Sequence, residues 1–156
     1  MKIQLWTIGP TDDQWLKEAY AVYEKRLTHY TAFETSYFPN VKNINKPTPD
    51  QLKQEEGKRF LNKLTPSDYL VLLDEQGKSF SSVEFSQWMQ KRMNSGIQQL
   101  VFAMGGAYGF SDPVYQASKE KIALSPMTFN HQMVRLIFIE QLYRSFTILK
   151  GEKYHH

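Results

Sequence analysis

Short apolar runs alternate with amphipathic segments along the whole chain. The runs predict five strands, at Met1–Gly9, Phe33–Phe38, Tyr69–Leu73, Leu100–Met104 and Lys121–Ser125. The run Tyr-Leu-Val-Leu-Leu at Tyr69–Leu73 does not alternate with polar residues. That pattern is typical of a parallel strand that is covered on both faces.

Apolar residues at helical spacing fill most of the intervening segments. They predict helices from Asp12 or Asp13 to about Thr28, from Asp50 to about Leu64, from Ser81 to about Asn94 and from His131 to about Leu149, and a short helix that begins at Ser111-Asp112-Pro113. The segment from Pro39 to Pro49 is predicted to be an open loop. Strands that alternate with helices predict an α/β fold, in which a mostly parallel sheet is covered by helices on both faces, within a single domain over residues 1–156.

The composition narrows the class of protein. There are no cysteines, which excludes a disulfide scaffold, a thiolate zinc site and a cysteine nucleophile. No run of about 18 apolar residues occurs and the first residues lack a signal-peptide pattern, so we expect a soluble, cytoplasmic protein without a membrane segment. The adjacent terminal histidines His155 and His156 rarely complete a coordination shell, so no metal is expected.

The net charge of +3 arises near the end of the chain. Residues 121–156 hold five basic and two acidic side chains, together with three of the four histidines. A local excess of positive charge suits a polyanionic partner such as nucleic acid. Three charges can equally belong to an ordinary solvated surface.

The last three predicted strands end in unusual loops, at residues 74–78, 105–109 and 125–129. Ligands of open α/β sheets bind at the carboxyl ends of strands, so these loops are expected to converge on one pocket. The alternative is that glycines and prolines simply end strands here. The glycines at 105, 106 and 109 do not match a dinucleotide-binding fingerprint, but they allow a flat ligand to lie against bare backbone.

The predicted helix at 131–149 is apolar around most of its circumference, which favours a subunit interface. Glu140 and Arg144 have the spacing of a surface ion pair. Arg135 is either a buried structural partner of an acidic group or an anion ligand, and His131 has the position of a capping or core histidine. The segment after Gly151 is interpreted as a frayed end or as the remnant of a purification tag.

Five motifs follow one another in an order that identifies a family. They are Leu73-Asp74 with Gly77-Lys78, then Phe102-Ala-Met-Gly105-Gly106-Ala-Tyr-Gly109, then Leu124-Ser125-Pro-Met-Thr128-Phe129-Asn-His131-Gln-Met-Val-Arg135, then Glu140-Gln-Leu-Tyr143-Arg144, and finally Tyr154-His155. Together they resemble the bacterial large-subunit ribosomal RNA pseudouridine N3-methyltransferase family, whose members are short proteins of the SPOUT class. With this resemblance the terminal histidines are interpreted as native.

The resemblance implies S-adenosylmethionine as the methyl donor, a homodimer, a ribosomal substrate and a trefoil knot formed by the C-terminal segment. Pro126 and Asn130 depart from the residues that many members carry, which leaves the shape of their loop open. By position in the motifs, the resemblance assigns donor binding to Leu73, Gly105, Leu124, Ser125, Pro126, Met127, Thr128 and Phe129.

The implied reaction removes a weakly acidic proton from N3 of pseudouridine, so a base or a cation is expected beside the acceptor. The predicted catalytic residues are His155, His131 and Arg135, and the predicted RNA contacts are Arg144, Lys153, Tyr154 and His156. Two other classes of function stay open. One is a knotted methyltransferase that acts on transfer RNA or on a ribose hydroxyl, and the other is a non-enzymatic ribosome-binding dimer.

Overall fold

A computed structural model describes residues 1–156 and contains one five-stranded sheet, in which every strand pair is parallel. The strand order is β2-β1-β4-β3-β5. The strands are β1 (Lys2–Ile8), β2 (Ala32–Phe38), β3 (Asp68–Ser79), β4 (Gln99–Met104) and β5 (Glu120–Ala123). The predicted α/β class with a parallel sheet is confirmed.

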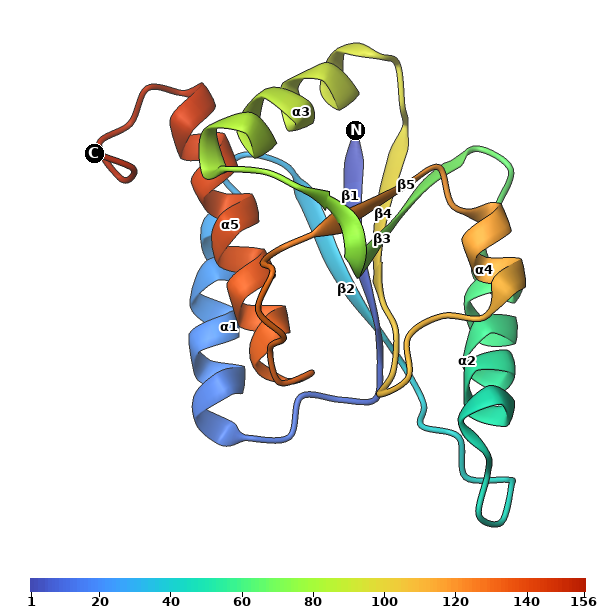
Figure 1. Ribbon diagram of the computed structural model, residues 1–156. Helices are drawn as coiled ribbons and strands as arrows, with labels where there is room; N and C mark the ends of the chain where they lie inside the picture. The colour runs from blue at the N-terminus through green and yellow to red at the C-terminus, as the bar shows by residue number, and fades with distance from the viewer.

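Helices cover both faces of the sheet, as predicted (Figure 1). On one face lie α1 (Gln14–Leu27), α3 (Ser82–Asn94) and α5 (Met133–Leu149), and on the other lie α2 (Pro49–Lys63) and α4 (Asp112–Ala117). None of these helices combines the length and the apolar character that crossing a lipid bilayer requires. The trefoil knot is not decided by strand order or pairing and stays a prediction.

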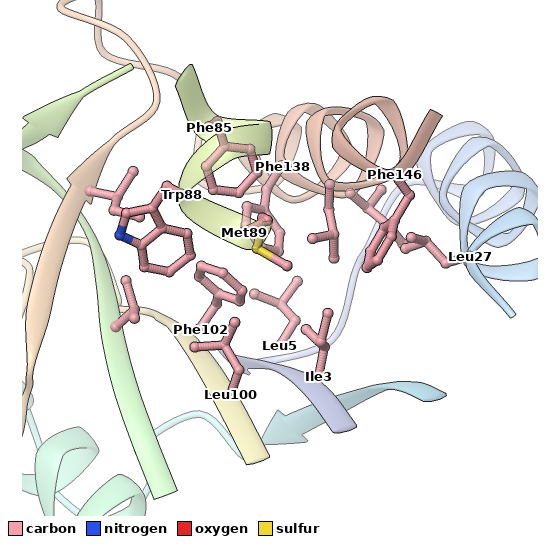
Figure 2. Close-up of a cluster of buried hydrophobic side chains, with 14 of the residues drawn as sticks. Ile3, Leu5, Leu27, Phe85, Trp88, Met89, Leu100, Phe102, Phe138 and Phe146 are labelled. Carbon is pink, nitrogen blue, oxygen red and sulfur yellow. The ribbon is translucent and has the colours of Figure 1, made fainter. Parts of the chain in front are cut away.

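The larger core is aromatic and lies between the sheet, α3 and α5 (Figure 2). Phe102 of β4 meets Phe138 of α5 with ring centroids 4.8 Å apart, and Trp88 of α3 packs on the same ring at 6.0 Å. Each such aromatic pair adds about 0.5–1.5 kcal/mol to the burial of apolar area. This core therefore fixes α5 against the sheet.

Capping boxes set the start of two helices. Ser81 accepts a hydrogen bond from the Glu84 backbone N–H, and the Glu84 carboxylate accepts one from the Ser81 N–H, so the predicted start of α3 is confirmed. Thr48 and Gln51 form the same arrangement before α2. For this reason α2 begins at Pro49, one residue before the predicted Asp50.

Strand β3 continues six residues beyond its predicted end at Leu73. After an irregular stretch, Lys78 pairs with Ile122 and Ser79 with Ala123, so β3 contacts β5 twice with a register shift. A side chain at Gly77 would place its Cβ 2.5 Å from the backbone nitrogen of Ile122, so glycine permits this approach. Non-local pairing with β5 extends β3 where local composition predicts a loop.

The end of β5 and the start of α5 also differ from the predicted bounds. Strand β5 ends at Ala123 rather than Ser125, and α5 begins at Met133 rather than His131. The segment between them is therefore a nine-residue connection, 124–132, in place of the shorter loop predicted from the sequence.

Candidate functional site

The three loops singled out in the sequence line one cavity at the carboxyl ends of β3, β4 and β5. Its volume is about 610 Å³, within the range of roughly 300–1,000 Å³ that small-molecule sites occupy. Of the residues assigned to donor binding, Pro126 is not part of the lining. The others all line it: Leu73, Gly105, Leu124, Ser125, Met127, Thr128 and Phe129.

One wall of the cavity is the glycine loop, Gly105–Gly109. The Gly109 N–H donates to the Gly106 carbonyl oxygen at 3.2 Å, and Gly109 has a φ of +81°, which favours glycine. A Cβ on Gly105 would lie 2.8 Å from the Gly109 carbonyl oxygen. The loop therefore closes tightly on itself and presents bare backbone to the cavity.

The cavity also holds a carboxylate that the sequence analysis quoted in a motif without assigning it to the site. Asp74, at the irregular stretch of β3, accepts hydrogen bonds from the Tyr115 hydroxyl and from the Gln76 backbone N–H. Burial and this hydrogen bond raise the pKa of Tyr115 to about 12, so the phenol stays neutral. Asp74 stands directly after a buried apolar strand, which was the available signal. Tyr115, on the short helix α4, had no comparable signal.

Asn130 holds the connection that leads into α5. Its side-chain oxygen accepts hydrogen bonds from the backbone N–H groups of Gln132, at 2.8 Å, and Met133, at 3.4 Å. Gln132 in turn accepts from the Asp12 N–H and donates to the Pro10 carbonyl. Asn130 thus supplies a side-chain acceptor at the helix start. His131, which this turn carries, is exposed and lines the cavity.

Arg135 is 3% exposed and points into the protein. It donates to the carbonyl oxygens of Ile8, at 2.7 Å, and Gly9, at 3.1 Å, and to the Thr11 hydroxyl, at 3.2 Å. Burial lowers the pKa of Arg135. Its hydrogen-bond partners are neutral oxygens at the end of β1 and in the β1–α1 turn, and none of the ion pairs includes Arg135, so the ion-pair interpretation is wrong.

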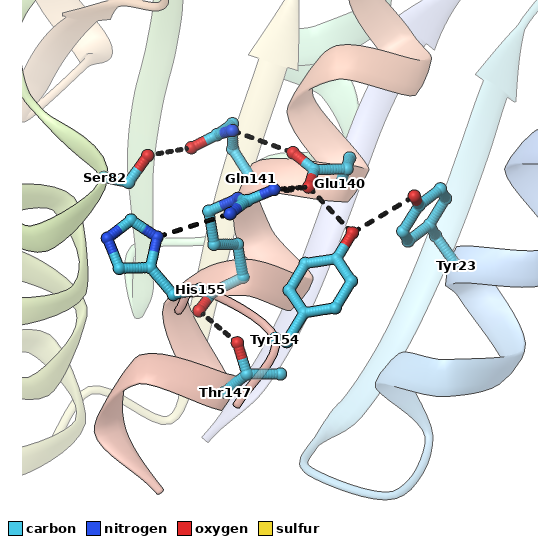
Figure 3. Close-up of polar contacts among 8 residues, drawn as sticks. Tyr23, Ser82, Glu140, Gln141, Thr147, Tyr154 and His155 are labelled. Atoms are coloured by element: carbon cyan, nitrogen blue, oxygen red, sulfur yellow. Dashed lines mark hydrogen bonds and ion pairs between the residues drawn. The ribbon is translucent and has the colours of Figure 1, made fainter. Parts of the chain in front are cut away.

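Tyr23, Glu140, Arg144, Tyr154 and His155 form a C-terminal cluster along the middle and C-terminal half of α5 (Figure 3). Glu140 accepts hydrogen bonds from the Arg144 guanidinium, at 2.7 and 3.1 Å, and from the Tyr154 hydroxyl, at 2.9 Å. The hydrogen bond to Glu140 raises the pKa of Arg144. Tyr23 and Tyr154 are hydrogen bonded at 3.2 Å, which joins the tail to α1.

Arg144 also determines which nitrogen of His155 is free. Its Nη1 lies 3.3 Å from His155 Nδ1. Because arginine has no acceptor, Nδ1 accepts this hydrogen bond, and the neutral imidazole carries its proton on Nε2. The Nε2–H of His155 is therefore a donor that Arg144 does not occupy.

The segment after Gly151 is packed against the body of the protein, so the frayed-end interpretation is wrong. The Tyr154 ring lies edge-on to Tyr143 with centroids 4.8 Å apart. The Tyr30 hydroxyl donates to Glu152 at 2.6 Å. Lys153 and His156 are exposed.

One chain does not bring the cavity and the C-terminal cluster together. Val134 lines the cavity, and Arg144 follows ten residues later on the same helix, a rise of about 15 Å. In Figure 1 the chain end lies at the upper left, whereas the first turn of α5 lies toward the bottom, near the carboxyl ends of β1 and β4. Of the predicted catalytic residues, only His131 is at the cavity.

Comparisons with known proteins place the whole chain in one family. A family model described as "Predicted SPOUT methyltransferase" matches residues 1–155. Proteins named ribosomal RNA large subunit methyltransferase H are similar along 156 residues, which is 100% of this chain: one from Cytophaga hutchinsonii is 58% identical over 100% of its own length, and those from Flavobacterium psychrophilum and Parabacteroides distasonis are 55% and 53% identical over 99% of theirs. The resemblance carried by the five motifs is thereby confirmed, and the chain belongs to the SPOUT methyltransferase family.

Proposed function

We propose that this protein methylates N3 of a pseudouridine in 23S ribosomal RNA, with S-adenosylmethionine as the donor. The observation that carries the proposal is the similarity, over the full chain, to proteins named as large-subunit ribosomal RNA methyltransferases. The cavity supports it, because it is formed by the loops that the motifs assign to the donor. A cytoplasmic location follows from a ribosomal substrate.

The chemistry of the cavity fits the proposed donor. Gly105 and Gly106 would offer bare backbone to a flat adenine, and Leu124 and Phe129 would supply apolar side chains beside it. Asp74 keeps acceptor capacity for the ribose hydroxyls or the amino group of the donor, since the carboxylate has about four lone-pair sites. When bound, the donor supplies an electrophilic methyl group on a sulfonium.

We assign Arg135 a positioning role instead of a catalytic one. Arg135 is the third residue of α5. It donates hydrogen bonds to three oxygens at the end of β1 and in the β1–α1 turn. The side chain thereby fixes the first turn of α5 next to the cavity. Removal of one partner from such a buried network leaves the others unsatisfied, at a cost of about 1–3 kcal/mol each.

His155 is proposed to donate a hydrogen bond to the acceptor base. Loss of the N3 proton places negative charge on the neighbouring carbonyl oxygens of the base, and an N–H donor held in place stabilises that charge. Glu140 holds Arg144, which occupies Nδ1 of the imidazole and leaves Nε2–H as the donor. His131, exposed at the cavity, is the candidate to receive the proton.

A homodimer is proposed to complete the site. Leu136 and Ile137 of α5 stay half-buried in a single chain. On α1, which packs beside α5, Trp15 and Val22 are 56% and 47% exposed and share one helix face. A second copy that covers this surface brings its own C-terminal cluster toward the cavity, across a distance that the chain's own cluster does not span.

The test is methyl transfer from labelled donor to intact ribosomes, large subunits and bare RNA, followed by mapping of the label. We expect label on large-subunit RNA and a stop in primer extension, because an N3 methyl group blocks the Watson–Crick edge. Label without a stop would indicate ribose methylation, and label on transfer RNA would indicate another knotted enzyme. Absence of donor binding by calorimetry would favour a non-enzymatic ribosome-binding protein.

A further inference from the structure

The carboxylate of Glu56 is buried without an ion-pair partner, next to the cavity but outside its lining. Glu56 lies on α2 and is 9% exposed. The ion pairs of the protein do not include it. A buried carboxylate without a paired charge costs several kcal/mol, so packing alone does not account for an acidic residue at this position.

The Glu56 carboxylate lies directly against the glycine loop. A Cβ built on Gly106 would be 2.4 Å from Glu56 Oε1 and 2.5 Å from Oε2, so both oxygens face this Cα. Burial raises the pKa of Glu56, whereas its closeness to the Gly106 backbone and the charge of Arg59 act in the opposite direction. Gly106 is therefore the group that the carboxylate contacts.

The next residue of α2 explains how the helix comes so close. A Cβ on Gly57 would lie 2.4 Å from the Ser111 hydroxyl oxygen and 3.0 Å from Val114 Cγ2. Glycine at 57 thus lets α2 approach the start of α4. Glu56 and Gly57 are adjacent on α2, and they contact Gly106 and Ser111. Those two residues bound a segment that contains all of the glycine loop except Gly105.

The loop has little else to hold it from within. Its internal backbone contact is one isolated bridge between Gly106 and Gly109, in which the Gly109 N–H donates to the Gly106 carbonyl. Glycine-rich backbone has the greatest conformational freedom to lose on ordering. A contact that orders the loop before the donor arrives lowers the entropic cost of binding.

We propose that Glu56 is a positioning residue for the methyl donor: its carboxylate holds the backbone at Gly106 and keeps the glycine loop in the conformation against which the donor lies. This inference rests on the proposed function, since it assigns the cavity to the donor. Glu56 itself does not touch the donor, because it does not line the cavity.

Calorimetry of S-adenosylmethionine binding to full-length variants tests the role of Glu56. Glu56→Ala is expected to weaken donor affinity about tenfold, equivalent to about 1.4 kcal/mol. Glu56→Gln keeps the shape and one acceptor oxygen, so its affinity should stay within about threefold of wild type. The matched control is Glu55→Gln, which removes a half-buried carboxylate paired with Lys58 on the same helix and should leave the affinity unchanged.

A double-mutant cycle tests the contact itself. Gly106→Ala places a methyl group against the carboxylate and should weaken donor affinity in the wild-type background, but much less in the Glu56→Ala background. If Glu56→Ala does not fold, folded Gly106→Ala decides alone, and wild-type affinity there overturns the inference. Wild-type affinity in folded Glu56→Ala overturns it as well. A wild-type protein that binds no donor overturns the proposed function together with this inference.

Discussion

The cavity lies at the N-terminal end of α5, the C-terminal cluster lies along its middle and C-terminal half, and the two are built in different ways. The cavity consists of backbone, glycine and a few neutral or singly charged groups, drawn from three loops. The C-terminal cluster consists of charged and aromatic side chains that hold one another, with Glu140 at the centre. The cavity is suited to bind a small ligand within a single chain. The C-terminal cluster is proposed to offer hydrogen-bond donors to a macromolecule.

In the proposed homodimer, the two regions divide donor binding and methyl transfer between two chains. Donor binding should depend on the cavity alone. Transfer to RNA should depend on the cavity of one chain and the C-terminal cluster of another. The largest expected effects therefore follow from changes that separate binding from transfer.

Truncation after Gly151 should reduce methylation of ribosomes by about 10²–10⁴-fold, because it removes Tyr154 and His155 from the C-terminal cluster. Donor affinity, measured by calorimetry, should stay unchanged, since no residue after Val134 lines the cavity. His156→Ala, which alters an exposed terminal residue, serves as the milder control. A truncated protein with the wild-type rate would remove the tail from the mechanism.

Mixing two impaired variants, at a donor concentration that saturates the wild-type cavity but not the Gly105→Val cavity, sharpens the same prediction. The truncated chain keeps a complete cavity, and Gly105→Val keeps a complete C-terminal cluster. If the site is shared between chains, mixing should restore part of the activity through heterodimers. No recovery, in a sample where heterodimers form, would mean that each chain uses its own tail.

Ile137→Asp should convert the proposed dimer to a monomer, because an unpaired charge at a covered interface costs several kcal/mol. Ile137 is only half-buried within one chain, so the fold should be retained. Analytical ultracentrifugation at micromolar concentration checks the prediction. Gln116→Asp, on the exposed surface of α4 across the sheet, should remain dimeric. A wild-type monomer at that concentration would contradict the proposed assembly.

Gly105→Val should weaken donor affinity by at least about tenfold, or about 1.4 kcal/mol. The branched side chain meets the Gly109 carbonyl oxygen and intrudes on the backbone wall of the cavity. The melting temperature reports whether the variant is folded. Equal donor affinity in a folded variant would show that the donor does not lie against this loop.

Glu56→Gln should raise the free energy of unfolding at neutral pH, because it removes a negative charge from a buried position. Burial raises the pKa of Glu56 above its ordinary value of 4.5, so the folded protein binds a proton more readily than the unfolded chain. Relative to Glu56→Gln, the wild-type protein therefore loses stability as the pH rises from 4.5 through the raised pKa of Glu56. Urea midpoints should be higher for Glu56→Gln at pH 7 and converge below about pH 4. A urea midpoint at pH 7 that is lower for Glu56→Gln than for wild type would contradict this prediction.

Lys153→Ala should have the smallest effect. The exposed ammonium is proposed to contact phosphate, so ribosome binding should weaken in a salt-dependent way, with the slope of log K against log salt reduced by about 1. Lys58→Ala, on α2, provides a matched control of equal charge change. An identical salt slope for both variants would leave Lys153 without a role in binding.

Much of the fold was accessible from local pattern. The order of strands and helices, the parallel sheet and the capping box at Ser81 all follow from periodicity and from residues within one helical turn. The end of β3 did not, because Lys78 and Ser79 join the sheet only through pairing with β5, more than 40 residues away. Local composition at 74–78 contains no information about that partner.

The candidate site divides along the same line. Glycines and apolar strand ends predicted where a ligand lies, since backbone approach requires glycine wherever it occurs. The sequence did not predict Glu56 or Tyr115 at all, because each acquires its role from a helix that packs against a distant loop. Arginine is a residue type that commonly binds anions, yet the hydrogen-bond partners of Arg135 lie 124 to 127 residues earlier in the chain.

The sequence by itself determined the fold class, the family and the three loops that form the cavity, because short motifs and periodicity act over a few residues. Only the tertiary structure decided that Arg135 holds the β1–α1 turn, that Glu56 lies behind the glycine loop, and that His155 is oriented by Arg144 in the C-terminal half of α5. Each of these depends on where a side chain points after helices pack, and that direction is set by contacts between segments far apart in the chain.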